Sequence, residues 1–432
     1  MSVLAQKGKA TTDVFADIPV ASTSTRNNFP FPLEAVPALE LLLCCARRQL
    51  GAGRSARVGE LLEQRVDWDV LLSLANAHGL SPLLYWNLWR NFSQLLPPAV
   101  GKAIQDSFQS NAQRNLLLVL ELVEILRLLA SKNISVVPFK GPPLAEALYG
   151  NIALRQCSDL DLFIRPDDLA AGIKTLVSEG YSPVLQLSPP QQTAWVRSQY
   201  EFGLVSPSGA LIEFQWAIVP RYFSLPFGTE QLWQGLRTIR IGGVDALELS
   251  PENLLLVLCI HGGKHQWNRL VWLSDIAEII QLHADLDWDY AVRQARVHRA
   301  ERMLLLGLSL THTVFGTVLP ENISIRLTED KSVVSLNRQV CQTLIRGSEP
   351  GELAAHVFLI RTRERWSDKI RYILRFTLSP TSVEWSLVRL PKIFFPLYSA
   401  LRIARGFLKV GTLARRWARK RSGSVDSRAD DL

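Results

Sequence analysis

Apolar residues recur at helical spacing through the first part of the chain. Leu39, Leu42 and Leu43 show this spacing, and runs typical of strands are absent. Because such spacing places apolar side chains on one face of a helix, the pattern predicts a helical domain over 31–130. The residues before it, 1–30, are rich in Ser, Thr, Ala and Asn, which is typical of a disordered lead.

The pattern changes after Asn133 to alternating short strands and helices. Runs rich in β-branched and aromatic residues predict strands, and Gly and Pro residues separate them. Alternation of this kind predicts a mixed sheet. The predicted elements are a strand at 134–139, a helix at 144–150, a strand at 159–164, a helix from Asp167 to Glu179, a hairpin of 202–206 and 211–218 around Pro207-Ser208-Gly209, and two short strands at 238–241 and 246–249.

Helical periodicity returns at Ser250, which can cap a helix with Pro251 at its first position. We therefore expect an α+β fold in which a small mixed β-sheet forms a core flanked by helical domains. The expected units after the first helical domain are the core at 131–249, a second helical domain at 250–378 and a basic amphipathic tail at 379–432.

Composition narrows the class of protein. Hydrophobic residues make up 47% of the 432 and charged residues 20%, a balance that excludes global disorder. The five cysteines lack the spacing of a zinc site or a disulfide framework, which favours a reducing cytoplasm. We expect neither secretion nor a membrane span, because the start of the chain has no apolar signal and no uncharged run approaches about 20 residues.

The net charge of +8 indicates an anionic partner. Much of the excess lies between Arg361 and Arg375 and between Arg389 and Arg421. A nucleotide, a nucleic acid and a membrane surface all carry phosphate, so charge alone does not choose among them.

Asp159 and Asp161 are the first candidates for chemistry. Side chains alternate faces along a strand, so both carboxylates are expected on the same side, with Leu160 and Leu162 pointing into the core. Two carboxylates this close repel unless a cation lies between them, and hard oxygen ligands suit Mg²⁺ or Mn²⁺. An isolated D-x-D is nevertheless a weak signal, common on ordinary surfaces.

Glu213 strengthens the prediction. It lies in an otherwise apolar strand, where an unpaired charge would cost several kcal/mol. If its strand lies beside the Asp159–Asp161 strand, three carboxylates converge in the arrangement that holds metal ions for in-line phosphoryl displacement. Gln215 would share the face of Glu213.

The residues around these carboxylates resemble a known family. The segments are KGPPLAEALYGNIALRQCSDLDLFI at 140–164, LIEFQW at 211–216, HGGKHQWNRLVWLSDIAEI at 261–279 and WSDKIRYILRFTLSPTSVEW at 366–385. Together they resemble the uncharacterised bacterial nucleotidyltransferases of the DNA polymerase β-like superfamily, with a glycine-containing turn before the D-x-D strand and a third carboxylate on a later strand. The resemblance implies a nucleotidyltransferase core.

The resemblance also implies roles for the carboxylates. Asp159 and Asp161 would bind the metals, and Glu213 would complete one metal site and activate an acceptor hydroxyl. The implied reaction is metal-dependent transfer of a nucleoside monophosphate from an NTP to that hydroxyl, with pyrophosphate released.

Phosphate contacts are expected near the D-x-D strand. Lys140 and Gly141 stand where many superfamily members have Gly-Ser, in the turn that approaches the triphosphate. Lys140 could bind phosphate as a point charge, and Arg155 or Ser158 could add hydrogen bonds. Alternatively, Arg155 only neutralises the carboxylates.

His261, Lys264 and His265 form a second group. The two histidines are four apart, as zinc-binding pairs are, but the Glu of H-E-x-x-H is missing and no third ligand is evident. We expect Lys264 to face the nucleotide phosphates. One of the two histidines, His261 or His265, is expected to hydrogen-bond a phosphate or to orient a carboxylate. The alternative is that both histidines are packing residues at a domain seam.

The tail and the competing functions remain open. The basic tail could contact anionic lipid peripherally or pack on the helical domain, and Pro391 and Pro396 interrupt a long helix there. The alternative to an enzyme is a catalytically inactive nucleotide-binding regulatory module. An RNA-modifying enzyme is a third reading, but nucleic acid is not an expected partner because no recognised RNA-binding motif is present. The sequence identifies neither the acceptor nor the base.

Overall fold

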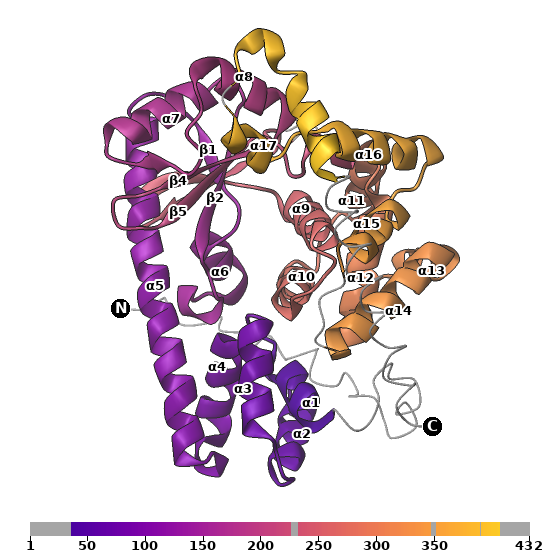
Figure 1. The fold of residues 1–432 in the computed structure, drawn as a ribbon. Coiled ribbons are helices and arrows are strands. Elements are labelled where there is room, and N and C mark those ends of the chain that lie inside the picture. Colours follow the sequence, from indigo (N-terminus) through magenta and orange to yellow (C-terminus); the bar gives the residue numbers. More distant parts are fainter. Residues whose placement is uncertain (1–35, 226–231, 347–350, 389, 407–432) are drawn as a thin grey trace, which may run out of the picture.

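The computed structural model describes residues 36–225, 232–346, 351–388 and 390–406. These residues form a small mixed sheet, a separate two-stranded ribbon and many helices on either side of them (Figure 1). The α+β class with helical flanks is therefore confirmed. The lead expected at 1–30 and the part of the tail from 407 to 432 lie outside the described residues.

The first part of the described chain is helical, as its periodicity predicted. The last of its helices, α5, runs from the other N-terminal helices to the sheet (Figure 1). Its Ile104 packs in the core of the helical part, whereas Leu122 and Leu129 pack in the core beneath the sheet. No helix in the described ranges is long and apolar enough to cross a membrane. The helices are α1 (Val36–Cys45), α2 (Ala52–Leu62), α3 (Trp68–Ala77), α4 (Ser81–Phe92) and α5 (Pro98–Ala130).

The central sheet has the strand order β1-β2-β5-β4-β3. β2 and β5 run parallel, and the other neighbours are antiparallel. The strand expected at 159–164 and the hairpin after it are confirmed, and the strand expected at 134–139 is shorter. The strands are β1 (Val136–Pro138), β2 (Asp159–Ile164), β3 (Ser182–Pro183), β4 (Glu201–Val205) and β5 (Leu211–Gln215), with α6 (Pro142–Tyr149) and α7 (Leu169–Ser178) between them.

The two faces of this sheet differ in chemistry. Leu160, Leu162 and Phe214 lie on one face and pack with α5 and α7 in a buried apolar core. Alternation along β2 and β5 therefore places Asp161 and Glu213 on the opposite face. The sheet is thus apolar on the side of α5 and α7. It carries acidic groups on the opposite side, which Lys264 at the end of α9 faces.

Two local elements were not predicted, and two predicted strands form a ribbon of their own. β3 has only two residues, whereas α8 (Pro189–Ser198) begins with Ser188-Pro189 and a capping box to Gln191, the same kind of start signal that predicted the helix after Ser250. The strands expected at 238–241 and 246–249 are confirmed, but they pair only with each other, as β6 (Arg237–Ile241) and β7 (Val244–Glu248).

The second helical part begins as its sequence indicated. The Ser250 side chain accepts a hydrogen bond from the Asn253 backbone N at 3.3 Å, and Pro251 opens α9. These helices lie on the acidic side of the sheet (Figure 1). They are α9 (Pro251–Lys264), α10 (Leu270–Leu282), α11 (Trp288–Val297), α12 (Glu301–Phe315), α13 (Glu321–Glu329), α14 (Lys331–Arg346), α15 (Glu352–Arg361) and α16 (Trp366–Leu378).

The described part of the tail packs against the sheet core. It forms α17 (Ser382–Leu387) and a second helix at 397–406, with Pro391 and Pro396 between them. The tail's Trp385 and Tyr398 are buried in the core that contains the apolar face of the sheet. These aromatic side chains fill the sheet core, and Arg402 lies 5.0 Å over the Phe376 ring of α16. The described part of the tail therefore packs on both the sheet core and the second helical part, in line with the alternative that it packs on a helical domain.

The packing of Trp267 against α9, in the second helical part, can be tested. A Cβ added at Gly262 would lie 2.3 Å from the Trp267 ring, whose side chain is fully buried. We expect Gly262→Ala to lower the free energy of unfolding by about 1–3 kcal/mol, because the ring must shift. Gly59→Ala in α2 is the matched control, since its nearest neighbour would lie 3.9 Å away. Urea denaturation of both variants checks this, and equal effects would contradict the packing.

Candidate functional site

The parallel pairing of β2 and β5 brings the predicted carboxylates together. Asp161 pairs in register with Glu213, and Asp159 lies two residues before Asp161 on the same face. The expectation that the strand of Glu213 lies beside the D-x-D strand is therefore confirmed. Three carboxylates from two adjacent strands share one side of the sheet.

Asp161 is buried and held by two hydrogen-bond donors. Its side chain is 4% exposed, and its Oδ1 lies 2.9 Å from Lys140 Nζ in a buried ion pair. Gln215 Nε2 donates to the same Oδ1 at 2.6 Å and to Glu213 Oε2 at 3.2 Å. Gln215 therefore shares the face of Glu213, as the alternation predicted, and it links two of the carboxylates.

Gly141 allows the chain to approach this cluster closely. Its φ is +71°, and an added Cβ would lie 3.0 Å from the Asp159 carbonyl O. A residue with a side chain would be strained here and would crowd β2. Gly141 therefore lets Lys140 lie beside Asp161 immediately before α6 begins.

The acidic groups raise each other's pKa. Burial, followed by the charges of Glu201, Asp161 and Asp159, raises the pKa of Glu213 to about 7. Burial and the charge of Asp161 also raise the pKa of Asp159. The cluster thus contains more buried negative charge than Lys140 alone compensates, and a cation at the site would be stabilised.

Lys264 lies at the end of α9 and faces this acidic side of the sheet. Its Nζ donates to the Tyr200 hydroxyl at 3.1 Å and lies 4.8 Å from the centre of the Tyr200 ring. Burial and then the charge of Lys140 lower the pKa of Lys264 to about 8. Lys140 thus lies close enough to lower the pKa of Lys264, although the two lysines belong to distant segments.

His261, half-buried in α9, and His265, exposed just after its last residue, lie beside an aromatic residue. The rings of His261 and His265 are 4.7 Å apart, and that of Trp272 lies 5.2 Å and 5.4 Å from them. Burial, followed by Lys264 and Lys140, lowers the pKa of His265 to about 3, and burial also lowers that of His261. Both rings are therefore neutral at pH 7, so they do not neutralise the carboxylates.

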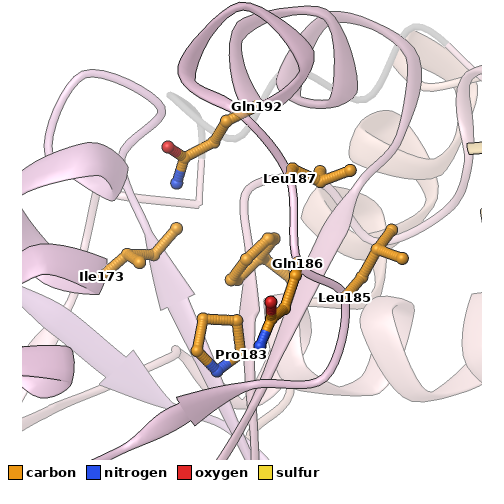
Figure 2. Close-up of a pocket in the computed structure, with 7 residues that line it drawn as sticks. Ile173, Pro183, Leu185, Gln186, Leu187 and Gln192 are labelled. Atoms are coloured by element: carbon orange, nitrogen blue, oxygen red, sulfur yellow. The ribbon is translucent and has the colours of Figure 1, made fainter. Parts of the chain in front are cut away.

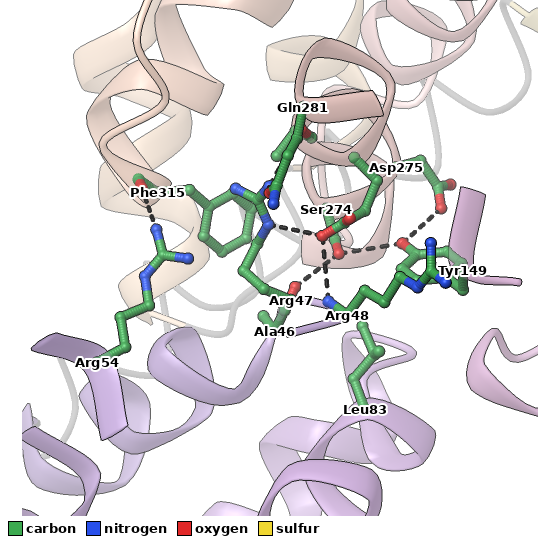
Figure 3. A network of polar contacts seen from close by, with 12 residues as sticks. Ala46, Arg47, Arg48, Arg54, Leu83, Tyr149, Ser274, Asp275, Gln281 and Phe315 are labelled. Atoms are coloured by element: carbon green, nitrogen blue, oxygen red, sulfur yellow. Dashed lines mark hydrogen bonds and ion pairs between the residues drawn. The ribbon is translucent and has the colours of Figure 1, made fainter. Parts of the chain in front are cut away.

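Arg155 binds a carboxylate outside the cluster, although its charge still lowers the pKa of Asp159. Its guanidinium forms a buried ion pair with Asp275, with Nη2 to Oδ2 at 3.0 Å and Nε to Oδ1 at 3.1 Å. Asp275 also accepts a hydrogen bond from the Tyr149 hydroxyl at 2.9 Å (Figure 3). Ser158 is exposed and hydrogen-bonds the Asp159 side chain. Of the two residues before β2 that were expected to bind phosphate, Arg155 and Ser158, only Ser158 contacts a carboxylate of the cluster.

The described residues contain no group of three or more His, Cys, Asp and Glu arranged to hold a metal ion. Lys140 and Gln215 already bind the Asp161 carboxylate, which accounts for the absence of a closed protein site around it. Mg²⁺ usually binds one or two carboxylates together with substrate phosphates and water. The donor set therefore fits a divalent ion that arrives with phosphate ligands, and it does not form a site made of protein alone.

Two residues near the cluster were not identified from the sequence. Tyr200 binds Lys264, and Glu201 raises the pKa of Glu213. Glu201 pairs in register with Gln215, on the same face as the carboxylates. Continuing the alternation one strand further, from Gly203 back to Glu201, would have found it.

A pocket on the other side of the sheet is separate from this site. It lies between α7, the segment after β3 and α8 (Figure 2). Its lining includes Phe202, which belongs to the apolar core on the face opposite the carboxylates. The pocket therefore does not adjoin the acidic cluster.

A small mixed sheet with a D-x-D strand and a third carboxylate on the parallel neighbour defines a nucleotidyltransferase-like protein. The chain belongs to the family of uncharacterised nucleotidyltransferases, whose family model matches residues 64–316. This range includes the three carboxylates, Lys140 and Lys264.

Other comparisons add little to this assignment. The crystal structure of an antigenic nucleotidyltransferase-like protein from Paracoccidioides brasiliensis matches with 17% sequence identity and a TM-score of 0.28. The match covers 48% of this chain and 95% of that chain. A likeness this weak carries no argument about the fold. No match was found among curated proteins.

The ion pair of Arg155 and Asp275 gives a test of what holds the site strand in place. We expect Asp275→Asn to lower the free energy of unfolding by about 3–5 kcal/mol, because it leaves a buried guanidinium without its counter-charge. Asp245→Asn removes the acid of an exposed pair with Arg240, whose side chains are 73% and 75% exposed, and should cost under about 1 kcal/mol. Guanidinium denaturation compares the two, and a small loss for Asp275→Asn would contradict the structural role.

Proposed function

We propose that this protein is a metal-dependent nucleotidyltransferase that moves a nucleoside monophosphate from an NTP to an acceptor hydroxyl, with release of pyrophosphate. The observation that carries the proposal is the registered pairing of Asp161 with Glu213 on parallel strands, with Asp159 on the same face. Membership of the nucleotidyltransferase family supports it. The catalytic residues proposed are Asp159, Asp161 and Glu213.

Asp159 and Asp161 would hold Mg²⁺ or Mn²⁺ together with the triphosphate oxygens. When bound, the ion would neutralise phosphate charge and lower the pKa of the acceptor hydroxyl. Glu213 would complete this donor set and accept the hydroxyl proton. Without a ligand, burial and the acidic neighbours raise the pKa of Glu213 to about 7, and a bound cation would lower it, so Glu213 would be ionised when it accepts the proton.

The basic groups around the cluster would bind the triphosphate. Lys140 and the Gly141 turn lie beside the carboxylates, and Lys264 faces the same side from α9. His265 lies one residue further on and would contact phosphate as a neutral ring. The Ser158 hydroxyl would add a hydrogen bond at the exposed edge.

Arg155 takes a different place in the proposal. Its guanidinium is engaged by Asp275, so we propose that it positions the D-x-D strand and contributes only long-range positive charge to nucleotide binding. This differs from a direct phosphate contact, which would require the buried ion pair to open.

Pyrophosphate release by the purified protein tests the reaction. Each of the four NTPs is supplied with Mg²⁺ or Mn²⁺, in buffer and in cell extract as a source of acceptor. We expect release with one or more NTPs, and its loss to background in Asp161→Asn, because the metal-binding carboxylate is gone. Glu213→Gln should lower the rate by about 100-fold or more, as expected on removing a general base.

Asp167→Asn is the matched control for this experiment, because Asp167 is an exposed acid just after the same strand. It should keep the full rate. An active Asp161→Asn protein would refute the assignment of the catalytic carboxylates. NTP binding with metal but no pyrophosphate under any condition would favour the alternative of a catalytically inactive regulatory module.

Lys140 gives a second test, with metal binding as its readout. Since its ammonium occupies Asp161 Oδ1, it competes with a divalent ion for the same oxygen. We expect Lys140→Met to bind Mn²⁺ alone about tenfold more tightly than the wild type and to bind NTP more weakly. The variant should be less stable without metal and should gain more in thermal midpoint when Mn²⁺ is added.

Calorimetric titration and thermal unfolding measure these effects of Lys140→Met. Lys132→Met, at an exposed position, is the control and should behave as the wild type. If Lys140→Met bound Mn²⁺ less tightly than the wild type, Lys140 would not be a competing cation.

A further inference from the structure

Helix α16 presents an apolar stripe to solvent. Trp366 is 78% exposed, Ile370 56%, Ile373 49% and Leu374 56%. These positions are three or four residues apart, so they lie on one side of the helix. The opposite side, with Tyr372 and Phe376, packs against the protein. We call the four exposed residues, together with Lys369 and Arg371 on either flank of them, the α16 face.

The charges around this stripe are positive. Lys369 and Arg371 flank the apolar residues, and Lys369 Nζ lies 4.8 Å from the centre of the Trp366 ring. The acidic residue of the helix, Asp368, is buried and paired with Arg299 at 2.8 Å and Arg371 at 3.0 Å. No negative charge of α16 itself therefore reaches the α16 face.

The tail carries further positive charge near α16. Arg402, in the helix at 397–406, lies 5.0 Å over the Phe376 ring, so this part of the tail passes along the packed side of α16 and not across the α16 face. From Trp385 to Val425 the sequence contains no Asp or Glu. A second copy of this surface would be repelled by like charge, whereas an anionic surface would be attracted.

We propose that the α16 face docks on an anionic lipid surface. The apolar stripe would enter the boundary between headgroups and acyl chains, and Trp366 would lie at the level of the headgroups. Lys369 and Arg371 would contact lipid phosphates at the two edges of the stripe. This arrangement is peripheral, and it is independent of whether the carboxylate site transfers nucleotides.

Flotation of the full chain with lipid vesicles tests the proposal. We expect binding to vesicles of phosphatidylglycerol and phosphatidylcholine, and none to phosphatidylcholine alone. Replacing Ile370 and Leu374 together by Asp should weaken binding at least about tenfold, because charge then replaces the inserted residues. Lys369→Gln should weaken it about fivefold and reduce its sensitivity to salt.

Leu117→Asp is the matched control, since Leu117 is 66% exposed on α5, outside the α16 face. It should bind vesicles as the wild type does. Circular dichroism and thermal midpoints equal to the wild type show that the variants are folded, as expected for exposed positions.

Three results would overturn the proposal. The first is wild-type vesicle binding by the doubly substituted protein, which would place lipid contact elsewhere. The second is equal binding to neutral and anionic vesicles. The third is self-association in solution that the Ile370 and Leu374 substitutions abolish without any vesicle binding by the wild type, which would make the face an interface between copies.

Discussion

The burial of negative charge beside β2 is the constraint on which the site depends. Asp161 is almost fully enclosed and its registered neighbour is Glu213. A buried carboxylate without a partner costs several kcal/mol, so the fold must bring donors to it. Lys140 and Gln215 meet this need from the turn after β1 and from β5. The turn after β1 requires Gly141, because any side chain there would crowd the β2 backbone. Charge compensation thus determines the path of the chain from β1 into α6.

A second set of buried charges lies on α10 and connects the start of β2 with both helical parts. Asp275 on α10 holds Arg155, which lies just before β2, and Tyr149 at the end of α6. The preceding Ser274 donates its hydroxyl to the Ala46 carbonyl at 2.7 Å, and Glu278 pairs with Arg47 at 2.7 Å (Figure 3). One helix therefore contacts the segment that carries the carboxylates and the chain that follows α1. Replacing a buried ion pair by apolar groups is often neutral, but removing one partner is not, so each member of this set depends on the others.

Short-range periodicity explains how much of this could be predicted from the sequence. The two-residue period of a strand was enough to place Asp159, Asp161, Glu213 and Gln215 on one face, and the Ser250-Pro251 pair was enough to begin α9. The partner of Arg155 lies 120 residues away, and no local pattern links them. The same holds for Lys264 and Tyr200, 64 residues apart. β3 was missed because a two-residue strand has no period. α8 was missed although Ser188-Pro189 and the capping box with Gln191 mark its start, as Ser250-Pro251 marks that of α9. Pairings that depend on how helices pack around the sheet require the structure.

The distribution of charge around the cluster bears on how a nucleotide would enter. Without a ligand, the carboxylates are compensated by the protein's own cation, Lys140, and only in part, since burial and mutual repulsion still raise the pKa of Glu213 to about 7. A free divalent ion would have to displace the ammonium from Asp161, leaving Lys140 buried without a counter-charge. A divalent ion bound to a triphosphate avoids this cost, because the phosphate oxygens supply a new partner for the displaced lysine. Under the proposed function, metal and nucleotide would therefore bind more favourably together than either does alone, and the exchange of partners at Lys140 is the physical origin of that coupling.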